Sequence, residues 1–536
     1  MTKYEGWYYN REIEDILLIT DITLSRAELY YIPVKTRLPL RFGNETVRTL
    51  QCLRVKLEVE NRAGSRAEGW GEVPLNVQWI WPLPEPAEPA DPVESAKAAQ
   101  PAEPAKHSEP MESAKSAESA ESAEQRCEVL KSFAGWFAKR LLEWDLSGHA
   151  LEIGCDVLSH YLEDARRLFN TGRDGELKLP FSSALAVFAA FDIAIHDAYG
   201  VVNQVPLYSA YQGEFFNRDL SFLIHSPDID SARFEGLYPS DFFRLRPVRN
   251  LDVWHLVGGD DPLHREDLEG LSVDDGYPLL LRDWIERDGL TSLKIKMFGK
   301  DPDEDFNRIV SVGKIAVQER VIRLSVDFNC TVKDLKYMRE LMDRLKREHP
   351  HLYDMLLFVE QPFSASSVRE GLDVSEISGM KPFFLDEGLM HWDTIPAAVR
   401  LGWTGAALKT CKSQSSAVLC GCAAQVYGME LMVMDLTNPM LAALSHAALA
   451  SHTPTLAGVE SNGPQYYPQA SLPEEDIHPG IFRRRKGEID VSSMSGYGIG
   501  YRIGEIKRDL PVPACSVETG GGTRASLYVA GGEVSG

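Results

Sequence analysis

The amino-acid sequence predicts an α/β protein in which a (β/α)8 barrel of the TIM type follows an α+β domain. From about residue 250, short apolar segments typical of strands alternate with amphipathic segments typical of helices, and this unit recurs eight times. The chain before residue 250 has the pattern of a strand meander followed by helices. A doubly wound open sheet is the alternative, but no predicted strand is followed by a Gly-rich phosphate loop, so we favour the barrel.

The composition and charge of the chain argue against some classes of binding partner. The chain has 536 residues, 44% of them hydrophobic, with 79 acidic and 56 basic residues. This is a normal globular composition, and its acidic excess argues against a nucleic-acid partner or an anionic membrane surface. The first twenty residues carry acids where a signal peptide has a basic start. No run approaches the roughly 18 apolar residues of a membrane span. We expect a soluble, cytoplasmic protein without a membrane partner.

The eight cysteines are scattered and show no zinc-finger spacing. Their density is far below that of a disulfide scaffold, so we expect buried, reduced thiols.

The first domain is expected to comprise residues 1–82 and 127–213. The segments "AELYYIPVKTRLPLRFG" and "LQCLRVKLEVENRAGSRAEGWGEVP" alternate in the manner of strands, with a turn at Asn61–Gly64. Later segments, among them "LPFSSALAVFAAFDIAIHDAYG", have apolar residues at helical spacing. Residues 83–126 interrupt this domain with PAEPA and ESA repeats that contain no aromatic residue. We expect a flexible insertion there, with transient helix in its Ala/Glu half.

The barrel is expected over residues 250–510. Its strand candidates from the second onward begin at intervals of roughly 23–33 residues. In chain order the eight candidates are "LDVWHLVGG", "SLKIKMF", "IRLSVDFN", "LLFVEQP", "PFFLDEG", "GAALKTCK", "ELMVMDL" and "TLAGVES". Residues 214–249 do not fit this repeat and are expected to form an added loop, and the Gly-rich residues 511–536 a flexible tail.

Charged residues recur where the predicted strands end. Lys294 and Lys296 in "LKIKMFG" are two residues apart and share one face of the second strand, as Asp327 and Asn329 do on the third. The carboxyl ends of barrel strands converge on one mouth. The residues expected to join these four there are Glu360 on strand four, Asp386 and Glu387 on strand five, and Lys409 on strand six, with Lys412 close behind.

These residue types suit one chemistry. Three carboxylates from successive strands form a hard oxygen site that suits Mg²⁺. A single acid could merely cap the following helix, but three in succession, flanked by lysine-bearing strands, are not easily explained that way. Next to a divalent cation the pKa of an ammonium should fall, so a neutral lysine can act as a base. Lysines on strands two and six would face opposite sides of a substrate α-carbon, where one removes a proton and the other returns it or stabilises the charged intermediate.

The ordered motifs resemble those of the enolase superfamily, and more narrowly its muconate-lactonizing (muconate cycloisomerase-like) subgroup, related to mandelate racemase. The matching segments are "LKIKMFG", "SVDFNC", "FVEQPF", "FFLDEG" and "ALKTCK", with "GWGEVP" and "FAAFDIAIHDAYG" outside the barrel. The resemblance implies a capping domain, a modified barrel, and Mg²⁺-assisted removal of the proton α to a carboxylate.

The resemblance also assigns roles to individual residues. It implies that Asp327, Glu360 and Asp386 hold Mg²⁺, with Glu387 as the alternative third ligand. Lys296 and Lys409 would be the acid/base pair, with Lys294 tuning Lys296 or contacting the substrate carboxylate, and Asn329 just outside the metal ligands. His255, Asp435 and Glu460 are weaker substrate-lining candidates. A hydrogen-bonded structural role is the preferred explanation of His255, and helix capping explains Glu460 and Asp435 as readily as contact with substrate does.

The chain departs from the family pattern after strand six, where "KSQSSA" replaces a usual glycine pair. We expect Ser413–Ser416 to shape a different pocket, and the capping loop "PVKTRLPLRFGNETV" to help determine which substrate binds.

The predicted function is Mg²⁺-dependent enolate formation from a small carboxylate, as a racemase/epimerase or cycloisomerase in a homo-oligomer. The alternatives are a dehydratase acting by syn-elimination, of the o-succinylbenzoate synthase or acid-sugar kind, and a catalytically silent binding member. A metal-dependent hydrolase barrel would need an HxH pair on strand one, which is missing.

Overall fold

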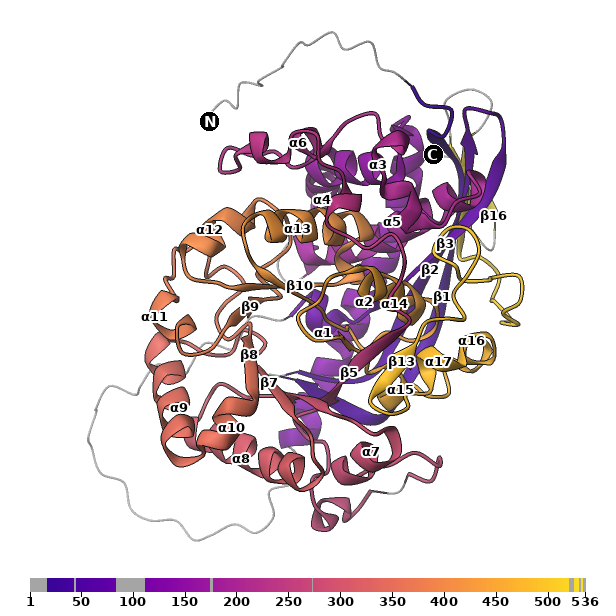
Figure 1. The fold of residues 1–536 in the computed structure, drawn as a ribbon. Helices are drawn as coiled ribbons and strands as arrows, with labels where there is room; N and C mark the ends of the chain where they lie inside the picture. The colour runs from indigo at the N-terminus through magenta and orange to yellow at the C-terminus, as the bar shows by residue number, and fades with distance from the viewer. Residues whose placement is uncertain are drawn as a thin grey trace, which may run out of the picture.

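The computed structural model describes residues 17–42, 45–82, 111–173, 177–271, 273–519, 525–529 and 532–533. Within these residues an antiparallel sheet with covering helices lies beside a closed barrel of parallel strands (Figure 1). The predicted fold class is confirmed: a (β/α)8 barrel with a separate α+β capping domain.

The capping sheet is built on three long antiparallel strands. They are β1 (Ile22–Phe42), β2 (Glu45–Asn61) and β3 (Arg66–Leu75), in the order β1-β2-β3. Alternation buries one face, as the side chains of Leu53, Val55 and Leu57 show. The predicted turn is formed by the Asn61 side chain, whose Oδ1 accepts the backbone N–H groups of Ala63 and Ser65.

Helix α5 (Phe181–Val202) covers this sheet at very short range. A Cβ added at Gly71 would lie 2.1 Å from the carbonyl oxygen of Ala190, and one at Gly69 would lie 2.2 Å from the backbone nitrogen of Ala198. The glycines of β3 therefore allow the helix backbone to approach the strand. Among the described helices α5 alone has the length and hydropathy of a membrane span, but 94% of that stretch is buried within the fold, as expected of a core helix.

The other elements of the capping domain are short, apart from one helix. They are α1 (Val77–Ile80), α2 (Met111–Glu143), β4 (Ser147–Gly148), α3 (Ala150–Asp156) and α4 (Leu162–Phe169).

Two expected flexible segments are partly ordered. Helix α2 begins at Met111, so the end of the predicted insertion is helical, and Arg126 within it is buried and donates to the Trp81 carbonyl. Residues 83–110 lie outside the described residues. In the predicted tail, β14 (Cys515–Thr519) pairs antiparallel with β1, because its alternation buries Cys515 and Val517. The strands that continue this sheet are β15 (Ala525–Val529) and β16 (Gly532–Glu533).

The added segment 214–249 contains only short helical turns, including α6 (Leu220–Leu223). It is not a loose loop, because Leu220, Ile224 and Phe234 are fully buried.

Eight parallel strands close the barrel, since β12 pairs with β5 (Val459 opposite Val253). Each of the eight predicted strands is found. Their bounds are β5 (Asn250–Val257), β6 (Ser292–Lys296), β7 (Arg323–Asp327), β8 (Leu356–Glu360), β9 (Phe383–Leu385), β10 (Gly405–Leu408), β11 (Glu430–Val433) and β12 (Val459–Glu460), and β13 (Glu488–Asp490) adds antiparallel to β5.

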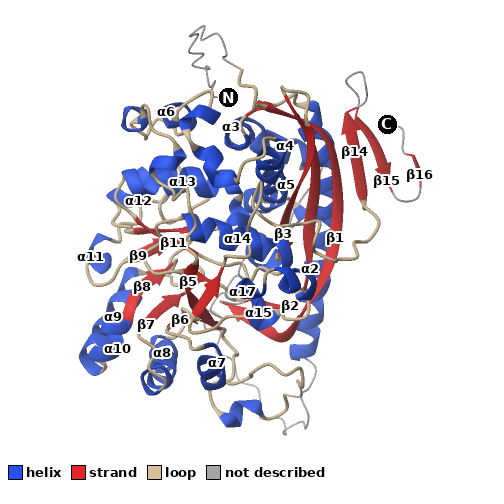
Figure 2. Ribbon diagram, turned by 45° about the vertical axis from the view of Figure 1, so that its right-hand side comes forward, coloured by secondary structure: helices blue, strands red, loops and turns tan. Residues whose placement is uncertain are grey.

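Helices surround the strands (Figure 2). Local signals set their ends: Asp301 caps α8 with Pro302 at its first position, and Gly289 ends α7 at φ +68°. The helices are α7 (Leu281–Asp288), α8 (Pro302–Gln318), α9 (Leu335–Glu348), α10 (Pro350–Met355), α11 (Ser375–Ser378), α12 (Thr394–Arg400), α13 (Gln414–Val426), α14 (Met440–His452), α15 (Gly463–Tyr466), α16 (Leu472–Ile477) and α17 (Pro479–Phe482).

Buried ion pairs fix the capping domain against the barrel domain. Arg54 of β2 donates to Glu72 of β3 at 2.5 Å and to Glu474 of α16 at 3.1 Å, with all three side chains buried. At the far end of β1, the carbonyl oxygen of Arg41 accepts the N–H of Gly259, which follows β5. The β1–β2 hairpin therefore reaches the mouth of the barrel.

Candidate active site

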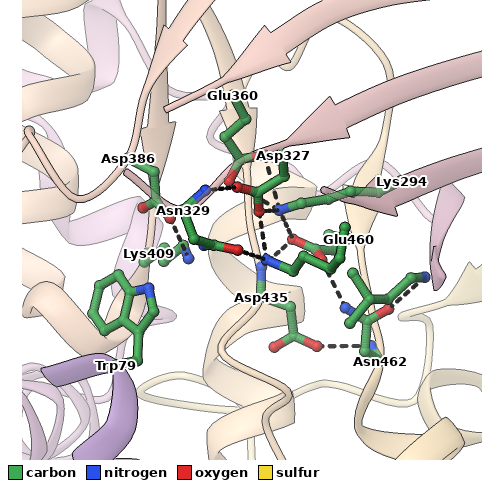
Figure 3. Close-up of polar contacts among 12 residues, drawn as sticks. Trp79, Lys294, Asp327, Asn329, Glu360, Asp386, Lys409, Asp435, Glu460 and Asn462 are labelled. Atoms are coloured by element: carbon green, nitrogen blue, oxygen red, sulfur yellow. Dashed lines mark hydrogen bonds and ion pairs between the residues drawn. The ribbon is translucent and has the colours of Figure 1, made fainter. Parts of the chain in front are cut away.

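The lysine pair of β6 points into the barrel mouth. The Nζ atom of Lys294 lies 3.0 Å from Asp327 Oδ2, 2.8 Å from Glu360 Oε2 and 3.0 Å from Glu460 Oε2 (Figure 3). One ammonium thus links the ends of β7, β8 and β12. Ile295 lies between the two lysines and is buried on the opposite face of the strand.

Lys296 contacts the third strand of the barrel. Its Nζ atom lies 2.5 Å from Asp327 Oδ2 and donates to Asn329 Oδ1 at 2.9 Å. Asn329 has φ +46°, a left-handed conformation that asparagine adopts more readily than most residues. This turn directs the Asn329 amide toward both Lys296 and Glu387.

A second lysine pair lies at the end of β10. Lys409 Nζ is 2.6 Å from Asp386 Oδ2, and Lys412 Nζ is 2.9 Å from Asp386 Oδ1 and 2.6 Å from the Asp386 carbonyl oxygen. Lys412, which the sequence marks only by its proximity to Lys409, therefore belongs to the site. A single carboxylate holds both ammonium groups in place.

Glu387 is turned away from this pair. Its Oε1 accepts the amide N–H of Asn329 and the indole N–H of Trp79, each at 2.9 Å. The neighbouring acids at the end of β9 therefore have different partners: Asp386 contacts lysines, whereas Glu387 contacts neutral donors.

Burial and mutual charge shift the pKa values of these groups. Burial, reinforced by Asp327, raises the pKa of Glu360 to about 8. Burial alone would also raise the pKa of Asp327 and of Asp386, but the nearby lysines lower both. Burial lowers the pKa of Lys294 and of Lys409, and the surrounding carboxylates outweigh this and raise it. The predicted lowering of a lysine pKa therefore has to come from a cation bound to the same carboxylates.

The donor set fits a divalent cation that prefers oxygen ligands. Glu387 Oε2 is a buried oxygen without a hydrogen-bond donor, whereas Glu360 Oε2 and Asp386 Oδ2 each have a lysine ammonium beside them as an ion pair. Carboxylate oxygens are the ligands that Mg²⁺ takes. Within the described ranges no three acids, histidines or cysteines already form a metal-ligand cluster. The Lys294 ammonium lies between Asp327 and Glu360, so it has to give way when these two carboxylates bind a metal.

The three weaker candidates occupy different places. Glu460 lies in the site, where it contacts Lys294 and accepts from Asn462 Nδ2 at 2.7 Å. Asp435 accepts the backbone N–H groups of Asn438 and Asn462, so its carboxylate holds loop backbone. His255 does not reach the mouth: Trp254 points into the barrel, so His255 points outward and packs on Trp284 of α7, with ring centroids 5.5 Å apart. The expected contact of His255 with substrate is therefore corrected: its side chain lies between the barrel strands and helix α7.

Two aromatic residues of the capping domain were not foreseen. The Trp79 ring lies 4.6 Å from Lys409 Nζ, and the Phe42 ring lies 5.7 Å from Lys296 Nζ. Each acid/base candidate thus contacts one ring. An aromatic cluster, "QWIW", follows "GWGEVP" in the sequence, but nothing local indicates which ring faces the barrel.

Ser415, one of the serines that stand where the family has a glycine pair, contacts the capping domain. Ser415 donates its backbone N–H and its hydroxyl to Asp192 of α5, at 2.7 and 2.8 Å. Its Oγ also lies 2.9 Å from His196 Nε2, and all three residues are fully buried. Ser415 therefore joins the barrel loop after β10 to the capping domain, and the different pocket expected at Ser413–Ser416 stays a prediction.

Comparison with known proteins agrees with this geometry. Residues 279–505 match the model of the family described as enolase C-terminal domain-like. No curated protein matches the chain.

Solved structures share the fold at low identity. The N-succinyl Arg/Lys racemase from Bacillus cereus has a TM-score of 0.53 at 16% identity, covering 89% of this chain and 95% of that one. The L-Ala-D/L-Glu epimerase from Bacillus subtilis has 0.51 at 18%, covering 89% and 98%. The muconate lactonizing enzyme from Pseudomonas fluorescens has 0.52 at 15%, covering 91% and 99%. Residues 279–505 thus match an enolase C-terminal domain-like domain, and the solved structures share the fold of the chain.

Proposed function

We propose that this protein is a Mg²⁺-dependent enzyme that removes the proton α to the carboxylate of a small substrate, as a racemase/epimerase or cycloisomerase. The observation that carries this proposal is the placement of Lys296 and Lys409. In the closed ring of eight strands, β6 and β10 are four strands apart and thus on opposite sides. A substrate carbon between them presents one face to each lysine.

The two lysines divide the proton transfer. One amine takes the α-proton from its face, which leaves an enolate, and the ammonium on the other face returns a proton to the same carbon. Cycloisomerisation uses one of these transfers and closes or opens a ring. We favour transfer between the two faces because both lysines are held by a carboxylate, Lys296 by Asp327 and Lys409 by Asp386.

Asp327, Glu360 and Asp386 are the proposed Mg²⁺ ligands. We choose Asp386 over Glu387 because the charge of Asp386 acts on the pKa of both Asp327 and Glu360, so its carboxylate lies near both. When bound, Mg²⁺ would hold the substrate carboxylate and stabilise the negative charge that develops there. Among described residues at the mouth, four lysines face five acids, so a divalent cation turns an excess of negative charge into an excess of positive charge. An anionic substrate suits that balance. The four lysines are Lys294, Lys296, Lys409 and Lys412, and the five acids are Asp327, Glu360, Asp386, Glu387 and Glu460.

The test is exchange of the α-proton with solvent. The protein with Mg²⁺ in D₂O would be incubated with pooled amino acids, N-acyl amino acids, dipeptides, sugar acids and muconates, and products followed by mass spectrometry. We expect a gain of one mass unit or an isomerised product, lost in Lys296→Ala and in Lys409→Ala but kept in Lys300→Ala, an exposed lysine just after β6. A product lighter by one water would instead identify a dehydratase. Mg²⁺ binding without exchange over the whole pool would favour a catalytically silent binding protein.

We further propose that the protein acts in the cytoplasm as a homo-oligomer, with no nucleic-acid or membrane partner. Sedimentation equilibrium tests the oligomer, and a molecular mass of one chain at all concentrations would contradict it.

A further inference from the structure

Trp79 touches the site through two different parts of its side chain. It lies on α1 of the capping domain and is 9% exposed. The indole N–H donates to Glu387 Oε1 at 2.9 Å, and the ring centroid lies 4.6 Å from Lys409 Nζ. The ring thus contacts the acid/base candidate of one face, while the N–H contacts the acid next to its carboxylate partner.

We propose that Trp79 is the positioning residue for Lys409, through which the capping domain sets this lysine independently of Lys296. The proposal rests on the proposed function, since only there do the two lysines act as acid and base. An ammonium over an indole face is attracted by the ring quadrupole, and tryptophan is the strongest partner of this kind. Lys409 is therefore held between the Asp386 carboxylate and the Trp79 ring.

The N–H contact gives the ring a fixed orientation. Glu387 Oε1 accepts from Trp79 and also from Asn329 Nδ2, and Asn329 Oδ1 in turn accepts from Lys296 Nζ. When the Trp79 N–H is removed, Glu387 Oε1 still accepts from Asn329, so the contact between Asn329 and Lys296 is retained. Without the N–H, the ring can still cover Lys409, but its tilt is no longer fixed by Glu387.

The opposite lysine provides a matched comparison. Lys296 has the ring of Phe42 at 5.7 Å, more distant and without a polar group. Each lysine therefore has its own aromatic contact, and the two can be removed separately. Trp79→Leu should disturb Lys409 and spare Lys296, whereas Phe42→Leu should do the reverse.

Competitive trace acetylation tests this without any knowledge of the substrate. The Mg²⁺-loaded proteins would be labelled with a small amount of acetic anhydride, and the Lys409 and Lys296 peptides quantified by mass spectrometry. In Trp79→Leu we expect the ratio of Lys409 to Lys296 labelling to rise at least several-fold. Phe42→Leu should lower the ratio, and Trp79→Phe, which keeps a ring, should stay close to wild type.

Trp81→Phe is the control, because Trp81 lies two residues further on, is also buried, and contacts Arg126 through its carbonyl oxygen. Its ratio should equal that of wild type. An unchanged ratio in Trp79→Leu, or an equal rise at both lysines as in a general opening of the site, would overturn the proposal. Circular dichroism checks folding, and Trp79→Met replaces Trp79→Leu if the latter does not fold.

Enzymatic exchange adds a second readout. If a chiral substrate is found, Trp79→Leu should slow exchange of the enantiomer whose α-proton faces Lys409 by roughly tenfold or more, within the range of a mispositioned general base. The other enantiomer should be far less affected, and kcat should fall more than KM rises. Equal loss for both enantiomers would overturn the proposal. If wild type shows no exchange at all, the proposed function fails, while the labelling ratio still decides the role of Trp79.

Discussion

Lys294 Nζ lies 2.8 Å from Glu360 Oε2, with both side chains inaccessible to solvent. An isolated buried carboxylate is costly, and this pairing offsets part of that cost. A metal ion that binds this oxygen has to displace the Lys294 ammonium from it.

Removing one carboxylate should therefore weaken Mg²⁺ binding. We expect Glu360→Gln to lower Mg²⁺ affinity at least about tenfold, since an amide oxygen carries no charge. Loss of a group that only hydrogen-bonds to a metal ligand already lowers affinity about 10–100-fold, and loss of a ligand should cost no less. Isothermal titration calorimetry measures this directly. Asp386→Asn and Glu387→Gln, compared in the same experiment, identify the third ligand: a larger loss for Glu387→Gln would reverse our choice.

If Lys409 is the proposed acid/base, a positive charge alone at this position should not sustain catalysis. Lys409→Arg keeps a cation next to Asp386, but a guanidinium stays protonated and cannot act as a base. We expect kcat to fall by roughly 10²–10⁴-fold with little change in Tm. Lys300→Arg, in the exposed loop after β6, should keep full activity. Substantial activity in Lys409→Arg would remove Lys409 from the acid/base pair.

Acid should destabilise the fold through His196. Burial lowers its pKa to about 3, whereas the unfolded chain has the ordinary value of 6.5. Above pH 6.5 both states are neutral. As the pH falls below it, only the unfolded chain binds the proton, so stability is lost. The loss reaches about 2 kcal/mol by about pH 5.

Urea unfolding of wild type and His196→Asn from about pH 7 to about pH 5 measures this difference. The variant should be less stable at neutral pH, where it lacks the imidazole contacts with Ser415 and Tyr211. Its stability should nevertheless fall less steeply with acid. Parallel pH curves for the two proteins would show that His196 does not contribute.

Close approach of α5 to β3 predicts a strong steric effect. Gly71→Ala places a methyl group 2.1 Å from the backbone of α5, so strand or helix has to shift. We expect a loss of at least about 2 kcal/mol in the free energy of unfolding. Gly379→Ala is the control, because its added Cβ would meet nothing closer than 3.5 Å and φ is −66°. Thermal unfolding distinguishes them, and equal Tm values would contradict the argument.

The barrel and the charged strand ends could be predicted from the sequence because both depend on short-range patterns. Alternation puts Lys294 and Lys296 on one face wherever the strand lies, and the (β/α)8 arrangement brings the strand ends together. Asp327 and Glu360 are accordingly found beside Lys294.

Contacts between distant segments could not be predicted in this way. Trp79 meets Glu387 across 308 positions of sequence, and Ser415 meets Asp192 across 223. The spacing of apolar residues along a segment does not indicate which distant residue it will contact.

The place of His255 could not be predicted for another reason. A fully buried strand has apolar residues on both faces, so the sequence does not show which face is the inner one. β14 was missed because its five residues lie in a Gly-rich stretch and are stabilised by pairing with β1.

The pairing of β1 with β14 bears on how the protein is made. Ribosomal synthesis delivers β1 early, but the strand that completes its outer edge along Arg26–Leu29 emerges only after the entire barrel. Glu474, the barrel-domain partner of Arg54, also arrives late. During translation the capping sheet therefore has an unpaired edge and an Arg54 without its Glu474 partner. The sheet is completed only when the barrel beside it has formed.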